Sequence, residues 1–65
     1  MNYLLYINDE SSSHLLNSLD EAKQFATRFI NCKSILRIEG YSSSAPISNW
    51  IYDYQIRDWV EQKLL

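Results

Sequence analysis

The chain has very few of the residues that build metal, thiol and phosphate sites. Its 65 residues include one cysteine (Cys32), one histidine (His14) and one glycine (Gly40). A disulfide within the chain is therefore excluded, and structural zinc is not expected because such sites use four thiolate or imidazole ligands. One glycine cannot supply the glycine-rich loops that cradle phosphates. We expect no catalytic residue, no cofactor and no metal, and therefore a protein that is not an enzyme.

Long apolar runs and a strong charge are lacking as well. The apolar segment 3–7 is ended by Asn8-Asp9-Glu10, which is too early for a signal peptide or a membrane span. The net charge is −2, and the six basic residues are spread along the chain among eight acidic ones. Compact nucleic-acid binders usually have a basic face. We therefore expect no membrane association, and a cytoplasmic location in which a lone cysteine stays reduced.

Apolar and aromatic residues, by contrast, are abundant. They make up 46% and 14% of the chain, respectively, which is not the composition of a disordered polypeptide. A chain of this length forms one small domain at most. The sequence therefore predicts a single folded domain over residues 1–65.

The first half of the chain predicts a strand and a helix. Residues 3–8 are β-rich and apolar on both faces, which is typical of a strand that is covered or central. Residues 14–17 fit either a short second strand or a lead-in to the helix. Ser18-Leu19-Asp20-Glu21 matches the capping box, and apolar residues recur at helical spacing after it, which predicts an amphipathic helix over residues 19–31.

The second half predicts strands at 34–41 and 49–53, with a loop over residues 42–46 between them. Residues 54–61 have two interpretations. In a hairpin they form a turn and a return strand, and Tyr52 faces Trp59 in a favourable aromatic pair. In a helix, the apolar residues from Ile56 onwards share one face. We favour the hairpin, although it places two like charges, Asp53 and Asp58, opposite each other.

These segments predict an α+β fold. The order is strand, possible strand, helix, strand, strand, and then strand or helix. The simplest packing is a small, mostly antiparallel sheet of three to four strands with one amphipathic helix on one face.

The aromatic residues of the second half give the functional hypothesis. One helix covers one face of a sheet, so the aromatic side chains exceed what it can bury, and Trp, Tyr and Arg are the usual anchors of protein interfaces. We expect a protein-interaction module, acting by stoichiometric binding as an inhibitor, adaptor or small subunit, as many small phage and mobile-element proteins do. Its partner is another protein or a second copy in a homodimer. The alternative is single-strand nucleic-acid binding by stacking, which the acidic balance argues against. The expected partner-binding residues are Tyr41, Trp50, Tyr52, Tyr54, Arg57 and Trp59.

Overall fold

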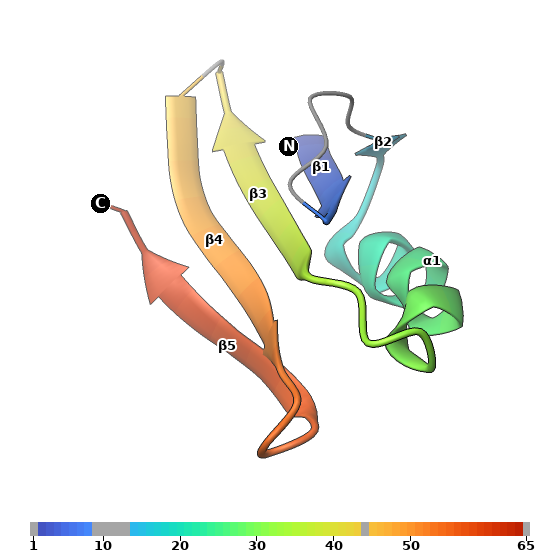
Figure 1. Ribbon diagram of the computed structural model, residues 1–65. Coiled ribbons are helices and arrows are strands. Elements are labelled where there is room, and N and C mark those ends of the chain that lie inside the picture. The colour runs from blue at the N-terminus through green and yellow to red at the C-terminus, as the bar shows by residue number, and fades with distance from the viewer. Residues whose placement is uncertain (1, 9–13, 44, 65) are drawn as a thin grey trace.

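The computed structural model describes residues 2–8, 14–43 and 45–64, which form one helix beside a twisted sheet (Figure 1). The elements are β1 (Asn2–Ile7), β2 (His14–Leu16), α1 (Leu19–Ile30), β3 (Leu36–Ser42), β4 (Ala45–Asp53) and β5 (Asp58–Lys63).

The sheet has five strands in the order β2-β1-β3-β4-β5, and every neighbouring pair is antiparallel. The predicted α+β class is therefore confirmed, but the predicted count of three to four strands is wrong. Both segments that the sequence left open turn out to be strands. Residues 14–16 pair with β1, and residues 58–63 pair with β4. Pairing with the preceding strand supplies the backbone partners that neither short segment finds within itself.

The capping box at the start of α1 is present. Ser18 Oγ accepts a hydrogen bond from the Glu21 backbone N–H at 3.1 Å, and the Glu21 carboxylate accepts one from the Asn17 N–H at 3.4 Å. The helix ends at Ile30, one residue before the predicted end. The turn after it is closed by the Lys33 N–H, which donates to the Ile30 carbonyl at 3.0 Å, with Lys33 itself at φ 55°.

The hairpin interpretation of residues 54–61 is confirmed, since β5 returns along β4 with Tyr52 opposite Trp59. Arg57, at φ 57°, supplies the positive φ that a glycine usually provides in a tight turn. Asp53 and Asp58 do lie opposite each other. Each carboxylate accepts a backbone N–H, Asp53 from Gln55 at 2.8 Å and Asp58 from Trp59 at 2.7 Å, which offsets their mutual repulsion.

The predicted loop over residues 42–46 is too long, because β4 already begins at Ala45; Ser44 lies outside the described residues. Pro46 is opposite Tyr41, next to a register shift between Gly40 and Tyr41. In the described chain, β5 pairs with β4 only from Ser48 onwards. Pro46 therefore lies in a part of β4 that has no strand partner on the β5 side, where the missing N–H of proline costs no hydrogen bond to β5.

Alternation along the strands divides the sheet into two faces, which we call the helix-side face and the open face. The core lies between α1 and the helix-side face of β1 and β3. Leu5, Leu36 and Ile38 are fully buried there together with Ala22 and Ala26 of the helix, and the larger apolar helix residues pack around them. The small alanine side chains allow the helix to approach the sheet closely, so β1 to β3 are well covered.

Candidate interaction site at the β4–β5 hairpin

The helix covers only part of its own face of the sheet. Over the described residues α1 packs on β1, β2 and β3, and its backbone does not approach β4 or β5. Figure 1 shows the β4–β5 hairpin extending beside the helix-covered half of the molecule. On the helix-side face of this hairpin, Trp50 joins the core, whereas Tyr52, Tyr54 and Trp59 stay only half-buried.

Three of these aromatic side chains form one cluster. The Tyr52 ring meets the Tyr54 ring with centroids 4.9 Å apart and the Trp59 ring at 5.3 Å, both in edge-to-face geometry. This is the preferred arrangement of aromatic pairs, and it fixes the rings relative to one another. All three residues are half-buried, so the cluster presents a preformed aromatic wall to solvent.

A cleft of about 580 Å³ separates this wall from the end of the helix. We call it the helix-end cleft. Tyr52 and Tyr54 form its hairpin side together with Arg57, and the segment after α1 forms the other side with Ile30, Asn31 and Lys33. The volume lies within the range of ordinary small-ligand and side-chain pockets.

The charges at this cleft are positive. In the part of the chain that the structure describes, the one ion pair joins Arg37 and Glu39 at 3.2 Å, so neither Lys33 nor Arg57 is paired with a described carboxylate. Both cations occupy left-handed backbone positions, Lys33 at φ 55° and Arg57 at φ 57°. A non-glycine residue at positive φ is uncommon, and here two such residues place cations on opposite sides of one cleft.

Tyr54 ties the two sides of the cleft together. Its hydroxyl donates a hydrogen bond of 2.5 Å to the backbone carbonyl of Ser34, in the segment that follows the helix. Burial, and then the neighbouring Tyr52 and Cys32, raise the pKa of the Tyr54 hydroxyl above its usual value of 10.0. The hydroxyl therefore keeps its proton, and the bond persists, throughout the neutral range.

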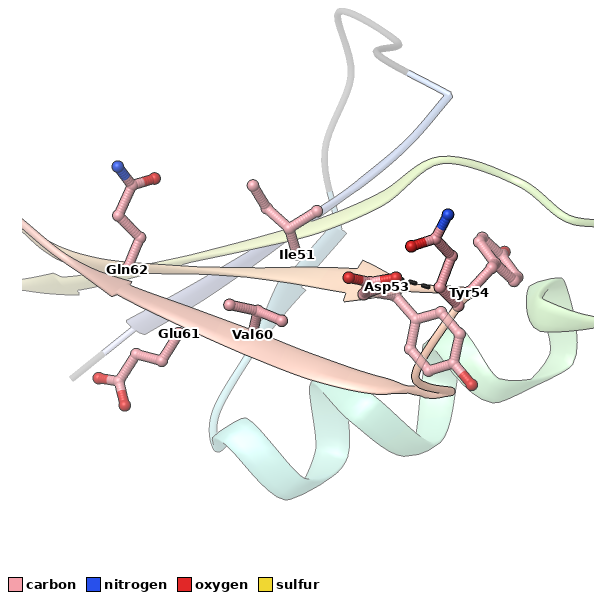
Figure 2. Close-up of a pocket in the computed structure, with 8 residues that line it drawn as sticks. Ile51, Asp53, Tyr54, Val60, Glu61 and Gln62 are labelled. Atoms are coloured by element: carbon pink, nitrogen blue, oxygen red, sulfur yellow. Dashed lines mark hydrogen bonds between the residues drawn. The ribbon is translucent and has the colours of Figure 1, made fainter.

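A second, open hollow of about 680 Å³ runs along the hairpin and is lined by residues 51–55 and 60–62. Figure 2 shows Ile51, Val60 and Gln62 on one side of the β4–β5 ribbon and Glu61 on the other. Tyr52 and Tyr54 line this hollow as well as the helix-end cleft. The two tyrosines are thus the feature that both concave surfaces share.

The structure brings together some of the six residues expected from the sequence and separates others. Tyr52, Tyr54 and Arg57 line the helix-end cleft, and the Trp59 ring contacts the Tyr52 ring edge to face. Trp50 is instead a core residue, 8% exposed. Tyr41 pairs with Asn2 and alternates onto the open face, away from the cluster.

Sequence reasoning missed the other side of the cleft, which is formed by Ile30, Asn31 and Lys33. Lys33 is one of six basic residues spread along the chain, and nothing local distinguishes it from the others. The one available signal was its position directly after the helix, where a residue at positive φ often ends the helix.

The open face is a weaker candidate for an interface because its apolar residues are not contiguous. The Arg37 guanidinium lies 4.2 Å from the Tyr6 ring centroid and pairs with Glu39, so a neutralised polar group occupies the middle of this face. Exposed Leu15 lies on one side of that group, on β2, and Ile51 and Val60 lie on the other. A patch marks an interface when its apolar area is continuous.

The residues with the most reactive side chains are placed separately. His14 packs its ring against Phe25, with centroids 5.0 Å apart, whereas Cys32 is exposed after the end of α1. Among the described residues, no group of three or more His, Cys, Asp or Glu side chains could hold a metal ion. No helix in the described ranges has the length and apolar character needed to cross a bilayer.

Comparison with known proteins provides no precedent for this arrangement. No protein-family model, no curated protein and no solved structure matches the chain.

Proposed function

We propose that this protein is a non-enzymatic interaction module that binds a protein partner through the helix-end cleft and its aromatic wall. One observation carries the proposal: α1 packs on β1, β2 and β3 but not on the β4–β5 hairpin, and Tyr52, Tyr54 and Trp59 form a fixed aromatic cluster beside a cleft. Rigid aromatic anchors next to a concave surface are the usual centre of a protein interface. The lone cysteine suits the cytoplasm as the compartment of this binding.

The chemistry of the cleft defines the partner segment that fits it. Tyr52, Tyr54 and Ile30 offer an apolar wall, and Lys33 and Arg57 offer two cations that no described carboxylate neutralises. A carboxylate between two cations gains charge-assisted hydrogen bonds that water alone does not match. The expected partner segment therefore carries an apolar or aromatic side chain next to an acidic residue or a C-terminal carboxylate.

The positive φ values allow the cations to be removed without damage to the fold. Asparagine tolerates the left-handed region better than lysine or arginine, so the double variant Lys33→Asn/Arg57→Asn should fold at least as well as the parent. Random peptides displayed on phage would be selected on the purified parent protein. We expect enriched peptides to combine an acidic and an aromatic position, and the double variant to bind them at least about tenfold more weakly.

Two matched controls make this experiment specific. Lys23→Gln removes one positive charge from the helix, and Tyr41→Ala removes a tyrosine from the open face; neither residue lines the cleft. Both variants should retain full peptide affinity. Selection of no peptide above background, or equal loss of binding in Tyr41→Ala and in the double variant, would refute the proposal.

The same cleft also favours one alternative, since two tyrosines and two cations could hold a base and a phosphate of a single-stranded nucleic acid. Fluorescence anisotropy with single-stranded DNA and RNA at low salt tests it. Binding that falls steeply with salt and is lost in Lys33→Asn/Arg57→Asn would support this alternative over a protein partner. The overall charge of −2 leads us to expect no such binding.

A further inference from the structure

The outermost strand β5 is an open sheet edge. It pairs with β4 on one side, and nothing in the described chain pairs with its other side. Almost every residue of the strand is exposed, including Val60 at 45%, and Leu64 just beyond it is 44% exposed. An edge of this kind is a template for pairing with another strand unless it is blocked.

The register shows which backbone groups point outward. The Leu64 N–H donates to the Ile47 carbonyl at 2.9 Å, so Leu64 directs its backbone groups towards β4. Because alternate residues of an antiparallel edge strand face inward and outward, Val60 and Gln62 also bond to β4, whereas Trp59, Glu61 and Lys63 direct their N–H and C=O groups outward.

One end of this edge is already occupied. The outward N–H of Trp59 donates to the Asp58 carboxylate at 2.7 Å, which withdraws it from pairing. The outward N–H groups left for a partner strand are therefore those of Glu61 and Lys63. An added strand can therefore pair with only a short stretch of β5, centred on Gln62.

A second copy of β5 fits this register when the two strands run antiparallel about a two-fold axis at Gln62. Glu61 of each copy then faces Lys63 of the other, and the exposed Val60 faces Leu64. An axis at Glu61 or at Lys63 places like charges opposite each other, and an axis at Val60 needs the Trp59 N–H that Asp58 already holds. Of these four axes, only the one at Gln62 satisfies both the charges and the backbone.

We infer that the protein forms a two-fold dimer by pairing β5 edges in this register, giving one continuous sheet of ten strands. Charged residues on an edge strand usually discourage pairing. Here two opposite charges spaced two residues apart are complementary to themselves, so they select this register. Such an isologous contact is closed, and it leaves the helix-end cleft of each copy accessible.

A charge-swap experiment tests the pairing. Sedimentation equilibrium should show a concentration-dependent dimer that Glu61→Lys or Lys63→Glu weakens about tenfold, because each change places two like-charged pairs across the axis. The Glu61→Lys/Lys63→Glu double variant should regain the parent affinity. An equimolar mixture of the two single variants should form a heterodimer, since opposite charges then meet at both positions.

Controls separate the pairing from an effect on folding. Glu61 also accepts a hydrogen bond from the Ser48 hydroxyl at 3.1 Å, so Glu61→Gln serves as a neutral control that can still accept it. Circular dichroism should show every variant folded. If one single variant fails to fold, the other single variant is compared with the double variant, which contains both substitutions.

The register itself can be fixed by a disulfide. Facing residues that are not hydrogen-bonded to each other lie about 4.5 Å apart at Cα, which a disulfide can bridge. In a Cys32→Ser background, Gln62→Cys should therefore oxidise to a covalent dimer, whereas Gln55→Cys in the exposed turn should not.

A protein that stays monomeric at millimolar concentration, or a dimer that is indifferent to the charge swap, would overturn this inference. So would higher oligomers that grow with concentration, which indicate head-to-tail pairing rather than a closed dimer. The outcome is independent of the proposed cleft, because neither Lys33 nor Arg57 lies on the β5 edge.

Discussion

Gly40, the only glycine, is the position where one methyl group should have the largest effect. Its φ is not in the left-handed region, so the backbone conformation does not require glycine. Space does. A Cβ at residue 40 would lie 2.9 Å from Trp50 Cζ3, 3.1 Å from Trp50 Cη2 and 3.3 Å from Tyr3 Cε1. We predict that Gly40→Ala destabilises the fold by forcing the Trp50 and Tyr3 rings apart.

The magnitude follows from two opposing effects. The Trp50 ring is rigid and 8% exposed, so it cannot simply turn away into solvent. Overpacking of this kind costs about 1–3 kcal/mol, and the lower entropy of the unfolded alanine chain returns about 0.4–1 kcal/mol. The net loss is about 1–2 kcal/mol, which for a domain of this size lowers the melting temperature by roughly 5–15 °C.

Thermal and urea denaturation, followed by circular dichroism, measure this loss. Ser42→Ala, an exposed position in the same strand, is the control and should change stability little. A partial rescue is also expected. Trp50→Phe removes the two ring atoms that the new methyl group would strike, so Gly40→Ala should cost less in that background. Unchanged or increased stability of Gly40→Ala, or strict additivity of the two changes, would refute the packing argument.

Four further predictions concern other parts of the fold. Ser18→Ala should lower the free energy of unfolding by about 1 kcal/mol while Ser18→Asp preserves it, and equal losses in urea denaturation would contradict the capping role. Asn49 has a buried Oδ1 with no hydrogen-bond partner in the described chain, so Asn49→Val should raise stability by about 1 kcal/mol; a loss would mean that the oxygen is satisfied. The edge-to-face contact of Tyr52 and Trp59 should give a coupling energy of about 0.5–1.5 kcal/mol in a double-mutant cycle with leucine, and additive losses would argue against it. Because the pKa of Tyr54 is raised in the folded state, the stability that its proton contributes should be constant below pH 10.0 and decline above it, as the unfolded chain loses that proton first; Tyr54→Phe should lack this part of the decline in alkaline urea titrations.

Local patterns in the sequence determined the parts of the fold that depend on neighbouring residues. The capping box at Ser18 fixed the start of α1, and the apolar spacing fixed which side of the helix meets the core. The alternation around Tyr52 and Trp59 indicated the hairpin, although only their edge-to-face contact in the structure shows the pair. Such features can be read from a sequence because their energies arise within a few residues along the chain.

Tertiary structure decided the rest, because strand order and helix coverage depend on contacts between distant segments. Period-two alternation assigns Trp50 and Tyr52 to the same face, but only packing against Tyr3 on β1 and Gly40 on β3 makes Trp50 a core residue, while Tyr52 lines a cleft. The short strand β2 exists because β1 offers its edge. Lys33 and Arg57 are far apart in sequence and share the helix-end cleft only because the turn after the helix and the turn of the hairpin meet in space. The sequence by itself thus indicated an excess of aromatic surface, whereas the tertiary packing decided which of those side chains stay available to a partner.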